Sequence, residues 1–244
     1  MALEFSVVIP AYNEHELLPR LLATLDIARS RYRGGLAAIE VIVADNDSSD
    51  DTADIAQRAG CRVVRVAKRC IAAARNGGAA AAAGKVLCFV DADSIVHPET
   101  FNVIADGFGA GAVAGTTGVH PERWSLGLRV TFALMLPVIW TTNIDAGVVF
   151  CRRADFEAIG GYNEDRQFAE DVEFLLALRS LGKGRSPRQR LVRLKGARTL
   201  TSTRKYDKHG EWHFLIEAAR HAVLMHLRPS ATAAFAQQYW YDDR

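Results

Sequence analysis

The chain has 244 residues, of which 49% are hydrophobic and 24% are charged. This composition excludes a disordered or fibrous chain, and the length fits one large α/β domain. With 30 basic against 28 acidic residues, the net charge is +2. No global field therefore attracts nucleic acid or an anionic membrane, and any basic function has to be local.

The first hundred residues alternate between predicted strands and predicted helices. Short β-branched runs predict strands, and apolar residues at helical spacing predict the helices between them. The strands are predicted at 5–9, 39–44, 62–66 and 86–90, and the helices at 14–31, 49–59 and 71–83. Apolar strands that alternate with helices predict an α/β fold, a mostly parallel sheet with helices on both faces and ligands at the carboxyl ends of the strands.

The second half of the chain is less regular. Strands are predicted at 112–117 and 147–151, with an apolar segment at 124–140 between them, and helices at 170–181 and 211–227. A Gly/Arg/Pro-rich connection spans 182–190. Because no repeat or linker separates the halves, we expect one domain over 1–244, with lobes at 1–97 and 98–244.

The longest apolar stretch, 126–140, is shorter than a bilayer span and contains Arg129 and Pro137. It predicts a buried or interfacial helix, and peripheral membrane contact stays open. The N-terminus lacks a signal-peptide pattern. The cysteines form no CxxC pair, and Cys88 and Cys151 lie in apolar runs typical of buried free thiols. We therefore expect a cytoplasmic protein.

Two carboxylates, Asp91 and Asp93, follow the predicted strand at 86–90. Two residues apart at the carboxyl edge of a sheet, both can reach one divalent cation, which can neutralise a diphosphate. The alternative is a polar turn that only ends the strand. The triplet alone does not decide between these interpretations.

Polar residues also follow the first two predicted strands. The run 10–14 contains a tyrosine and a glutamate, and a cluster of Asp, Asn and Ser follows the second strand. On the same edge as Asp91, a nucleotide base can pack against the first loop while carboxylates bond to its ring N–H or to ribose hydroxyls. Because the second cluster also precedes a helix, we assign Asp45 to the ligand and Ser48 or Ser49 to helix capping.

Two further charged sites have two interpretations each. Arg75 lies among small residues of a predicted helix, where it either contacts a phosphate or base or is a solvated helix residue. Glu170 and Asp171 begin another helix, where acids commonly complement the helix dipole. The aromatic segments 124–140 and 212–214 either shape an acceptor site or belong to the core.

Several motifs together resemble the family 2 glycosyltransferases of GT-A fold. They are SVVIPAYNE at 6–14, EVIVADNDSSD at 40–50, ARNGG at 74–78, DAD at 91–93, GGYNE at 160–164 and AEDVE at 169–173. Their order and spacing agree with the family over most of 5–182, and jointly they are far more specific than any one motif.

The resemblance implies an inverting enzyme that transfers a sugar from a nucleoside-diphosphate sugar, UDP- or GDP-linked, to an acceptor hydroxyl or phosphate. Cell-envelope polysaccharide or glycolipid synthesis is the implied setting, with the nucleotide sugar in the 1–97 lobe and the acceptor in the 98–244 lobe. The acceptor itself, whether a glycan, a lipid or a small molecule, is not identified by the sequence.

The resemblance also implies which residues bind the donor. Asp45 contacts the base, and Arg75 lies near the base or the diphosphate. Four residues of the first motif line the nucleotide pocket: Pro10, Ala11, Tyr12 and Glu14.

Metal binding and catalysis are implied for a second group of residues. Asp91 lies on the ribose or donor-sugar side, and with Asp93 it holds the Mg²⁺ or Mn²⁺ that bridges the diphosphate. Asp171 is the general base. A stretch at 201–205 resembles a Thr-Ser-x-Arg-Arg motif of some members, which suggests Arg204 as a cation near the leaving diphosphate and His209 as a third metal ligand.

One departure from the family pattern concerns the second loop. Asn46-Asp47-Ser48 stands where the family commonly has Asp-Gly-Ser, so a glycine is missing from that turn. Because Asn tolerates unusual backbone conformations, we expect a local change and retained binding. For Asp171, the helix start lowers the carboxyl pKa while burial and Glu170 raise it, and the balance stays open.

Two alternatives to this function remain. A sugar-phosphate nucleotidylyltransferase is disfavoured because the first loop lacks the glycine-rich, basic pattern for triphosphate attack. A non-catalytic nucleotide-binding scaffold is disfavoured because Asp91, Asp93 and Asp171 are all present. No GxGxxG follows the first strand, as a dinucleotide-dependent oxidoreductase requires, and no basic stripe indicates nucleic-acid binding.

Overall fold

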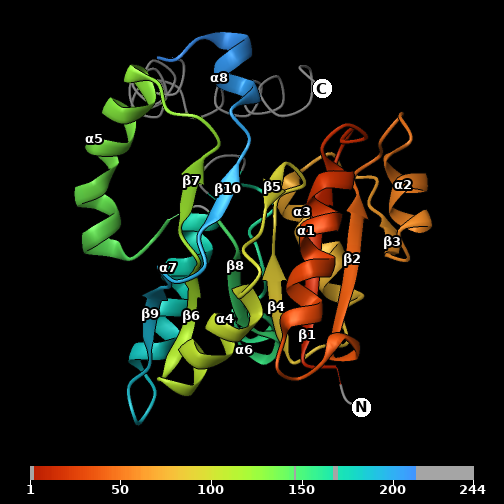
Figure 1. Cartoon of the computed structure of the whole chain (residues 1–244). Helices are drawn as coiled ribbons and strands as arrows, with labels where there is room; N and C mark the ends of the chain where they lie inside the picture. Colours follow the sequence, from red (N-terminus) through yellow and green to blue (C-terminus); the bar gives the residue numbers. More distant parts are fainter. Residues whose placement is uncertain (1–2, 146, 167–169, 213–244) are drawn as a thin grey trace.

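A seven-stranded sheet forms the centre of the computed structural model, which describes residues 3–145, 147–166 and 170–212 (Figure 1). Its strand order is β3-β2-β1-β4-β8-β6-β9, and a second sheet has the order β5-β10-β7. The strands are β1 (Phe5–Ala11), β2 (Ile39–Asp45), β3 (Arg62–Arg65), β4 (Val86–Phe89), β5 (Ser94–Ile95), β6 (Ala112–Thr116), β7 (Val119–Pro121), β8 (Val149–Arg152), β9 (Arg190–Arg193) and β10 (Thr199–Thr201).

Eight α-helices and one 3₁₀ turn are described alongside these strands. They are α1 (Leu18–Arg31), η1 (Leu36–Ala38), α2 (Thr52–Arg58), α3 (Ile71–Ala80), α4 (Thr100–Gly109), α5 (Leu126–Thr142), α6 (Arg153–Ala158), α7 (Glu170–Lys183) and α8 (Arg204–His209). The predicted helix at 211–227 lies largely outside the described residues.

The sheet is mostly parallel, as the sequence predicts. β1 runs parallel to β2 and β4, β2 to β3, and β6 to β9, whereas β8 is antiparallel to both of its neighbours. Every strand predicted within the described residues is present, to within a few residues at its ends. The sequence did not reveal β5, β7, β9 and β10, because two to four residues show no recognisable period.

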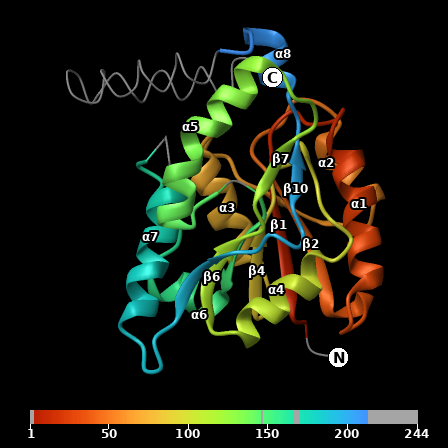
Figure 2. The same cartoon turned by 60° about the vertical axis from the view of Figure 1, so that its left-hand side comes forward.

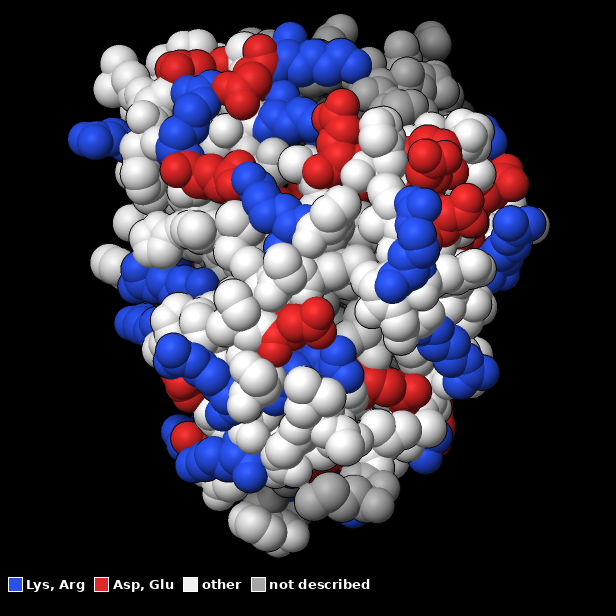
Figure 3. Space-filling view, turned by 45° about the vertical axis from the view of Figure 1, so that its right-hand side comes forward, with Lys and Arg blue, Asp and Glu red and all other residues white. Residues whose placement is uncertain are grey.

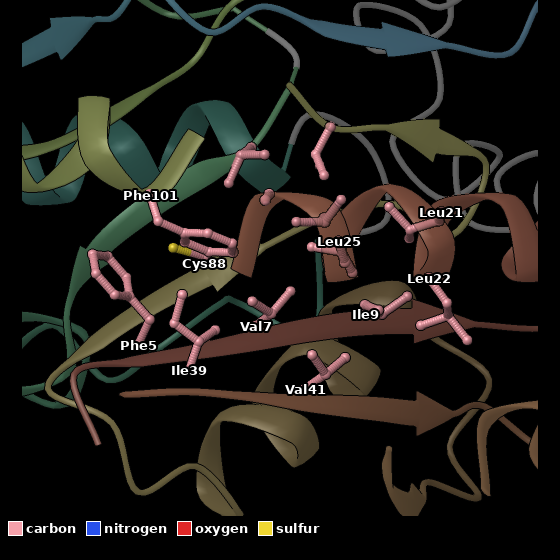
Figure 4. Close-up of a cluster of buried hydrophobic side chains, with 14 of the residues drawn as sticks. Phe5, Val7, Ile9, Leu21, Leu22, Leu25, Ile39, Val41, Cys88 and Phe101 are labelled. Carbon is pink, nitrogen blue, oxygen red and sulfur yellow. The ribbon is translucent and has the colours of Figure 1, made fainter. Parts of the chain in front are cut away.

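Helices cover both faces of the sheet because side chains alternate along its strands. In β1, Val7 and Ile9 face a core formed with α1, α2 and α4, and Val8 faces a second core formed with α3, α6 and α7. Figure 4 shows the first core, where Leu21 and Leu25 of α1 lie over β1. Figure 2 shows these helical layers from the side.

The apolar segment at 126–140 forms helix α5. No helix among the described residues is both long enough and apolar enough to cross a bilayer. Leu126, Leu134 and Trp140 are 57–70% exposed, whereas Leu128 is fully buried. Of the two predicted alternatives, a buried or an interfacial helix, the mixed exposure of these side chains fits an interfacial helix better. All four cysteines are free thiols, and Cys88 and Cys151 are buried as predicted.

We predict that the close packing of helix α3 on strand β1 is sensitive to the addition of one methyl group. A Cβ atom at Gly78 of α3 would overlap Cγ1 of Val8 in β1. We expect Gly78→Ala to lower the free energy of unfolding by about 1–3 kcal/mol, because overpacking displaces the helix. Urea unfolding followed by circular dichroism measures this.

Gly109→Ala is the matched control, since Gly109 ends α4 with no neighbouring atom near its position. We expect this variant to be as stable as the parent or slightly more so. Equal unfolding midpoints for both variants would show that α3 can move away from β1 without cost.

Candidate active site

The carboxyl ends of β1, β2 and β4 bring the first three motifs together. Ala11 at the end of β1 pairs with Asp45 at the end of β2, and Val8 pairs with Phe89 of β4. Asp91 therefore lies level with Pro10, one strand away. The parallel register thus gathers these residues at one edge of the sheet, as predicted.

Hydrogen bonds join the first loop to the second. The backbone N–H of Asn13 donates to Oγ of Ser48 over 3.1 Å, and the N–H of Ser49 donates to Oδ1 of Asn13 over 2.9 Å. The predicted capping role of these serines is wrong, because α2 begins at Thr52 with Asp51 as its N-cap. Both serines connect the two loops instead.

The turn after β2 is held by the side chains of its first two residues. The Asp45 carboxylate is buried and accepts from the N–H of Ser48 over 3.2 Å. Asn46 is also buried, and its amide donates to the carbonyls of Val66 and Lys68. Asp45 is therefore placed at the edge where a base contact is predicted, and it also stabilises the turn.

The missing glycine is accommodated by Asp47. Its φ angle of 67° lies in the left-handed region, which Asp and Asn tolerate better than other non-glycine residues. The expectation that Asn46 takes the unusual conformation is therefore wrong. Asp47 also pairs with Arg69 over 3.1 Å, and the guanidinium of Arg69 lies 5.1 Å from the centre of the Tyr12 ring.

Arg75 is the centre of the site. Its side chain is 4% exposed, so the solvated interpretation is wrong. Nη1 lies 2.8 Å from Oε1 of Glu170 and 3.1 Å from Oδ1 of Asp171, and Nη2 lies 3.1 Å from Oδ1 of Asp91. One cation thus joins α3, the turn after β4 and the start of α7.

Glu170 and Tyr162 were not identified as site residues from the sequence. Glu170 is buried against Arg75, and the Tyr162 ring lies 5.1 Å from the Arg75 guanidinium. Asn76 donates to the carbonyl of Tyr162 and accepts from its N–H, each over 2.9 Å. The adjacent motif residues Arg75 and Asn76 therefore hold the segments around Tyr162 and Glu170. The sequence did not indicate that Glu170 is buried, because acidic residues at the start of a helix are usually exposed to solvent.

Asp171 has the properties of a base that works near neutral pH. Its side chain is 35% exposed, and burial raises the pKa of its carboxyl to about 6 although Arg75 lowers it. Glu170 and Asp91 raise this pKa further. Burial and negative neighbours thus shift this pKa upward, against the effect of the opposing cation.

Arg204 of α8 reaches the loop that follows β1. Its Nη2 donates to both carboxylate oxygens of Glu14, over 3.0 and 3.2 Å, and Glu14 is 1% exposed. This pair joins residues 190 positions apart in the sequence. Arg204 thus lies beside a predicted pocket residue. The side chain of His209 is outside the described part of the structure, so its role stays a prediction.

Asp91 and Asp93 suit a metal site in which the substrate supplies the remaining ligands. Asp91 is 56% exposed and Asp93 is half-buried, both in the turn after β4. Among the described side chains, no group of three His, Cys, Asp or Glu residues could hold an ion. Mg²⁺ commonly binds to one or two carboxylates with substrate phosphates and water, so two aspartates suit that type of site.

Removal of the central cation is predicted to destabilise the fold in a pH-dependent way. Arg75→Met leaves Asp91, Glu170 and Asp171 clustered without a counter-charge, and we expect a loss of about 3–5 kcal/mol in unfolding free energy. Protonation relieves this repulsion, so the loss is larger at pH 8 than at pH 5. Urea unfolding at both pH values measures it.

Arg33→Met provides the control, because Arg33 is 62% exposed and pairs with Asp106 at the surface. Exposed pairs contribute about 0–1 kcal/mol, so we expect a small loss at both pH values. If Arg75→Met resembled this control, the buried cluster would not be what holds α3, α7 and the β4 turn together.

Comparison with known proteins agrees with this geometry. The family model described as "Glycosyl transferase family 2" matches residues 6–165. Validoxylamine A glucosyltransferase from Streptomyces hygroscopicus subsp. jinggangensis is 37% identical over 100 residues, which cover 38% of this chain and 23% of that protein. The aligned part is thus less than a quarter of that relative's length.

Solved structures share the fold at low sequence identity. S. aureus TarS in complex with UDP-GlcNAc matches with a TM-score of 0.63 and 20% identity, over 82% of this chain and 59% of the other. The mannosyltransferase PcManGT from Pyrobaculum calidifontis, in complex with GDP-Man and Mn²⁺, matches with a TM-score of 0.61 and 20% identity, over 82% and 57%.

These neighbours confirm the expected GT-A type of α/β fold. The family match covers well over half of the chain and includes helix α3 and the ends of β1, β2 and β4. The start of α7 and Arg204 of α8 lie beyond it. The chain belongs to glycosyl transferase family 2.

Proposed function

We propose that this glycosyltransferase transfers a sugar from a UDP- or GDP-linked donor to an acceptor hydroxyl or phosphate with inversion at the anomeric carbon. The main support is the buried Arg75, which brings Asp91 of the donor side within reach of Asp171 of the acceptor side. Structural neighbours bound to UDP-GlcNAc or to GDP-Man support this class of donor.

In the proposed reaction Asp171 is the general base. Its carboxylate accepts the proton of the acceptor hydroxyl as the oxygen attacks the anomeric carbon. The bond between that carbon and the diphosphate oxygen breaks on the opposite face, and the nucleoside diphosphate leaves with the electron pair. A pKa of about 6 keeps Asp171 ionised at neutral pH and close enough to it for effective proton transfer.

The nucleotide is proposed to bind over the first two loops. Pro10, Ala11, Tyr12 and Glu14 line its pocket, and Asp45 contacts the base. Arg75 fixes Asp91 toward the donor sugar or ribose, and Arg204, already paired with Glu14, supplies positive charge near the leaving diphosphate. Asp91 and Asp93, with His209 as a candidate third ligand, would hold Mg²⁺ or Mn²⁺, which neutralises charge on the diphosphate.

The proposal divides one domain into two lobes, with the donor held by 1–97 and the acceptor by 98–244. We further propose a place in cell-envelope polysaccharide or glycolipid synthesis in the cytoplasm, as the family resemblance implies. The acceptor class is left unassigned between glycan, lipid and small molecule.

A non-catalytic scaffold is less well supported, because an unused base would not need the buried cation and raised pKa found at Asp171. Binding to nucleic acid also lacks support on the face shown in Figure 3, where basic and acidic side chains are interspersed. Release of pyrophosphate in place of a nucleoside diphosphate would favour a nucleotidylyltransferase.

Substitution of the proposed base separates catalysis from donor binding. We expect Asp171→Asn to lower kcat by about 10²–10⁴-fold with little change in donor affinity. In the parent enzyme kcat/KM should rise with pH up to about 6 and then level off, because the base must be ionised. Steady-state kinetics and donor titration measure both.

Glu173→Gln on the same helix is the control. It also removes one negative charge, but Glu173 is not among the carboxylates that pair with Arg75. We expect near-parental turnover and the same pH profile. If the Asp171→Asn variant kept near-full turnover, Asp171 would be excluded as the base.

A thermal-shift screen of UDP-, GDP- and dTDP-sugars, with and without Mn²⁺, tests the donor and the metal. A ligand at 100 times its Kd stabilises the folded state by about 2.7 kcal/mol. We expect such a shift for one nucleotide series, and its Mn²⁺-dependent part should be lost in Asp93→Asn. No shift with any donor would count against the proposed donor class.

A further inference from the structure

Four cations line one cavity on the edge of the sheet that is far from the nucleotide loops. The cavity has a volume of about 450 Å³ and is lined by Thr142, Asn143, Arg179, Lys183, Arg188, Gln189, Arg190 and Leu191. None of these lining residues is acidic. Within the described part of the chain, no ion pair involves any of the four basic side chains.

The Gly/Arg/Pro-rich connection that presents this cation cluster is fixed in place. Arg185 donates over 3.0 Å to the buried Asp155 and over 2.6 Å to Gln189, and the N–H of Gln189 donates to the carbonyl of Gly182. These contacts explain the presence of Arg185 without a ligand, because its side chain stabilises the connection. Its basic neighbours Arg188 and Arg190 are exposed and have no such partner among the described residues.

Helix electrostatics explain only one member of the cluster. Lys183 lies in the last turn of α7, where cations complement the free carbonyl groups, whereas Arg179 lies one turn earlier. Arg188 and Arg190 follow the helix, in the connection and at the start of β9. Four like charges around one cavity favour an anionic ligand.

This ligand is not the donor diphosphate. Asp171 lies in the first turn of α7 at the candidate active site, and Arg179 follows it by eight residues, about 12 Å along the helix at 1.5 Å per residue. Lys183 lies a further turn away. The cation cluster is thus at the opposite end of α7 from the proposed chemistry.

An exposed apolar stripe on α5 leads to the same cavity. Leu126, Leu134 and Trp140 are 70%, 57% and 67% exposed, and the only charge on α5 is Arg129, another cation. These positions share one helix face, opposite the buried Leu128 and Thr131. The helix lies at the margin of the fold (Figures 1 and 2) and ends at Thr142, in the cavity wall.

We propose that the stripe and the cation cluster together dock the protein on an anionic phospholipid bilayer. An interfacial helix inserts apolar and tryptophan side chains into the headgroup region, and adjacent cations bind the lipid phosphates. The absence of acidic residues from the cavity wall provides the charge complementarity. Docking would place the acceptor lobe at a membrane and does not depend on the proposed reaction.

The test is co-sedimentation of the full chain with vesicles of phosphatidylcholine alone and of an equal mixture with phosphatidylglycerol. We expect strong binding only to the mixture. Arg188→Gln with Arg190→Gln should weaken it by about 30-fold, since each cation at an anionic surface contributes about 1 kcal/mol, or about fivefold. Trp140→Ser should weaken binding as well.

Arg58→Gln with Arg65→Gln is the matched control, because it removes two exposed charges at the β3 edge, opposite β9. We expect it to bind vesicles like the parent, and all variants to keep the parental donor-induced thermal shift. Docking would be overturned by no binding to the mixed vesicles or by equal losses in both double variants. Without vesicle binding, capture of free pyrophosphate at the cluster would assign the cations to a soluble anion. A dimer that Trp140→Ser dissociates, again without vesicle binding, would assign the stripe to a second copy.

Discussion

The structure of the site depends on a buried guanidinium. Arg75 lies on a helix of small residues that packs closely against the sheet, so its charge is enclosed by protein. A charge in this environment is stable only when it is paired, and its partners come from two other elements, the β4 turn and the start of α7. The positions of Asp91, Glu170 and Asp171 are therefore linked to one another through Arg75.

The same arrangement sets the chemistry of Asp171. Full neutralisation by Arg75 would hold the pKa of this carboxyl low and make it a weak base, but Glu170 and Asp91 share the cation. With burial, the shared charge leaves the pKa at about 6. A cluster of three carboxylates around one arginine thus combines structural cohesion with a carboxyl pKa that suits the base we propose.

Opposite ends of α7 have different surroundings. Its first turn lies within the buried charge cluster, whereas its last turn opens into a cavity with four cations and no acid in its described wall. The rigid helix fixes the separation between them. If the cation cluster and the α5 stripe bind a membrane, this separation sets the height of the active site above the lipid surface.

The sequence by itself determined the alternation of strands and helices, the family, and the edge of the sheet where the motifs meet, because periodicity and parallel strand order follow from local pattern. It did not determine which charges are buried. Arg75 and Glu170 look like solvated helix residues in sequence, and the sequence predicts that Asn46, not Asp47, takes the unusual backbone conformation of the turn. The Glu14–Arg204 pair and the cavity of four cations join segments far apart in the chain. Only tertiary packing decides such contacts, since burial and charge pairing depend on neighbours that local sequence does not specify.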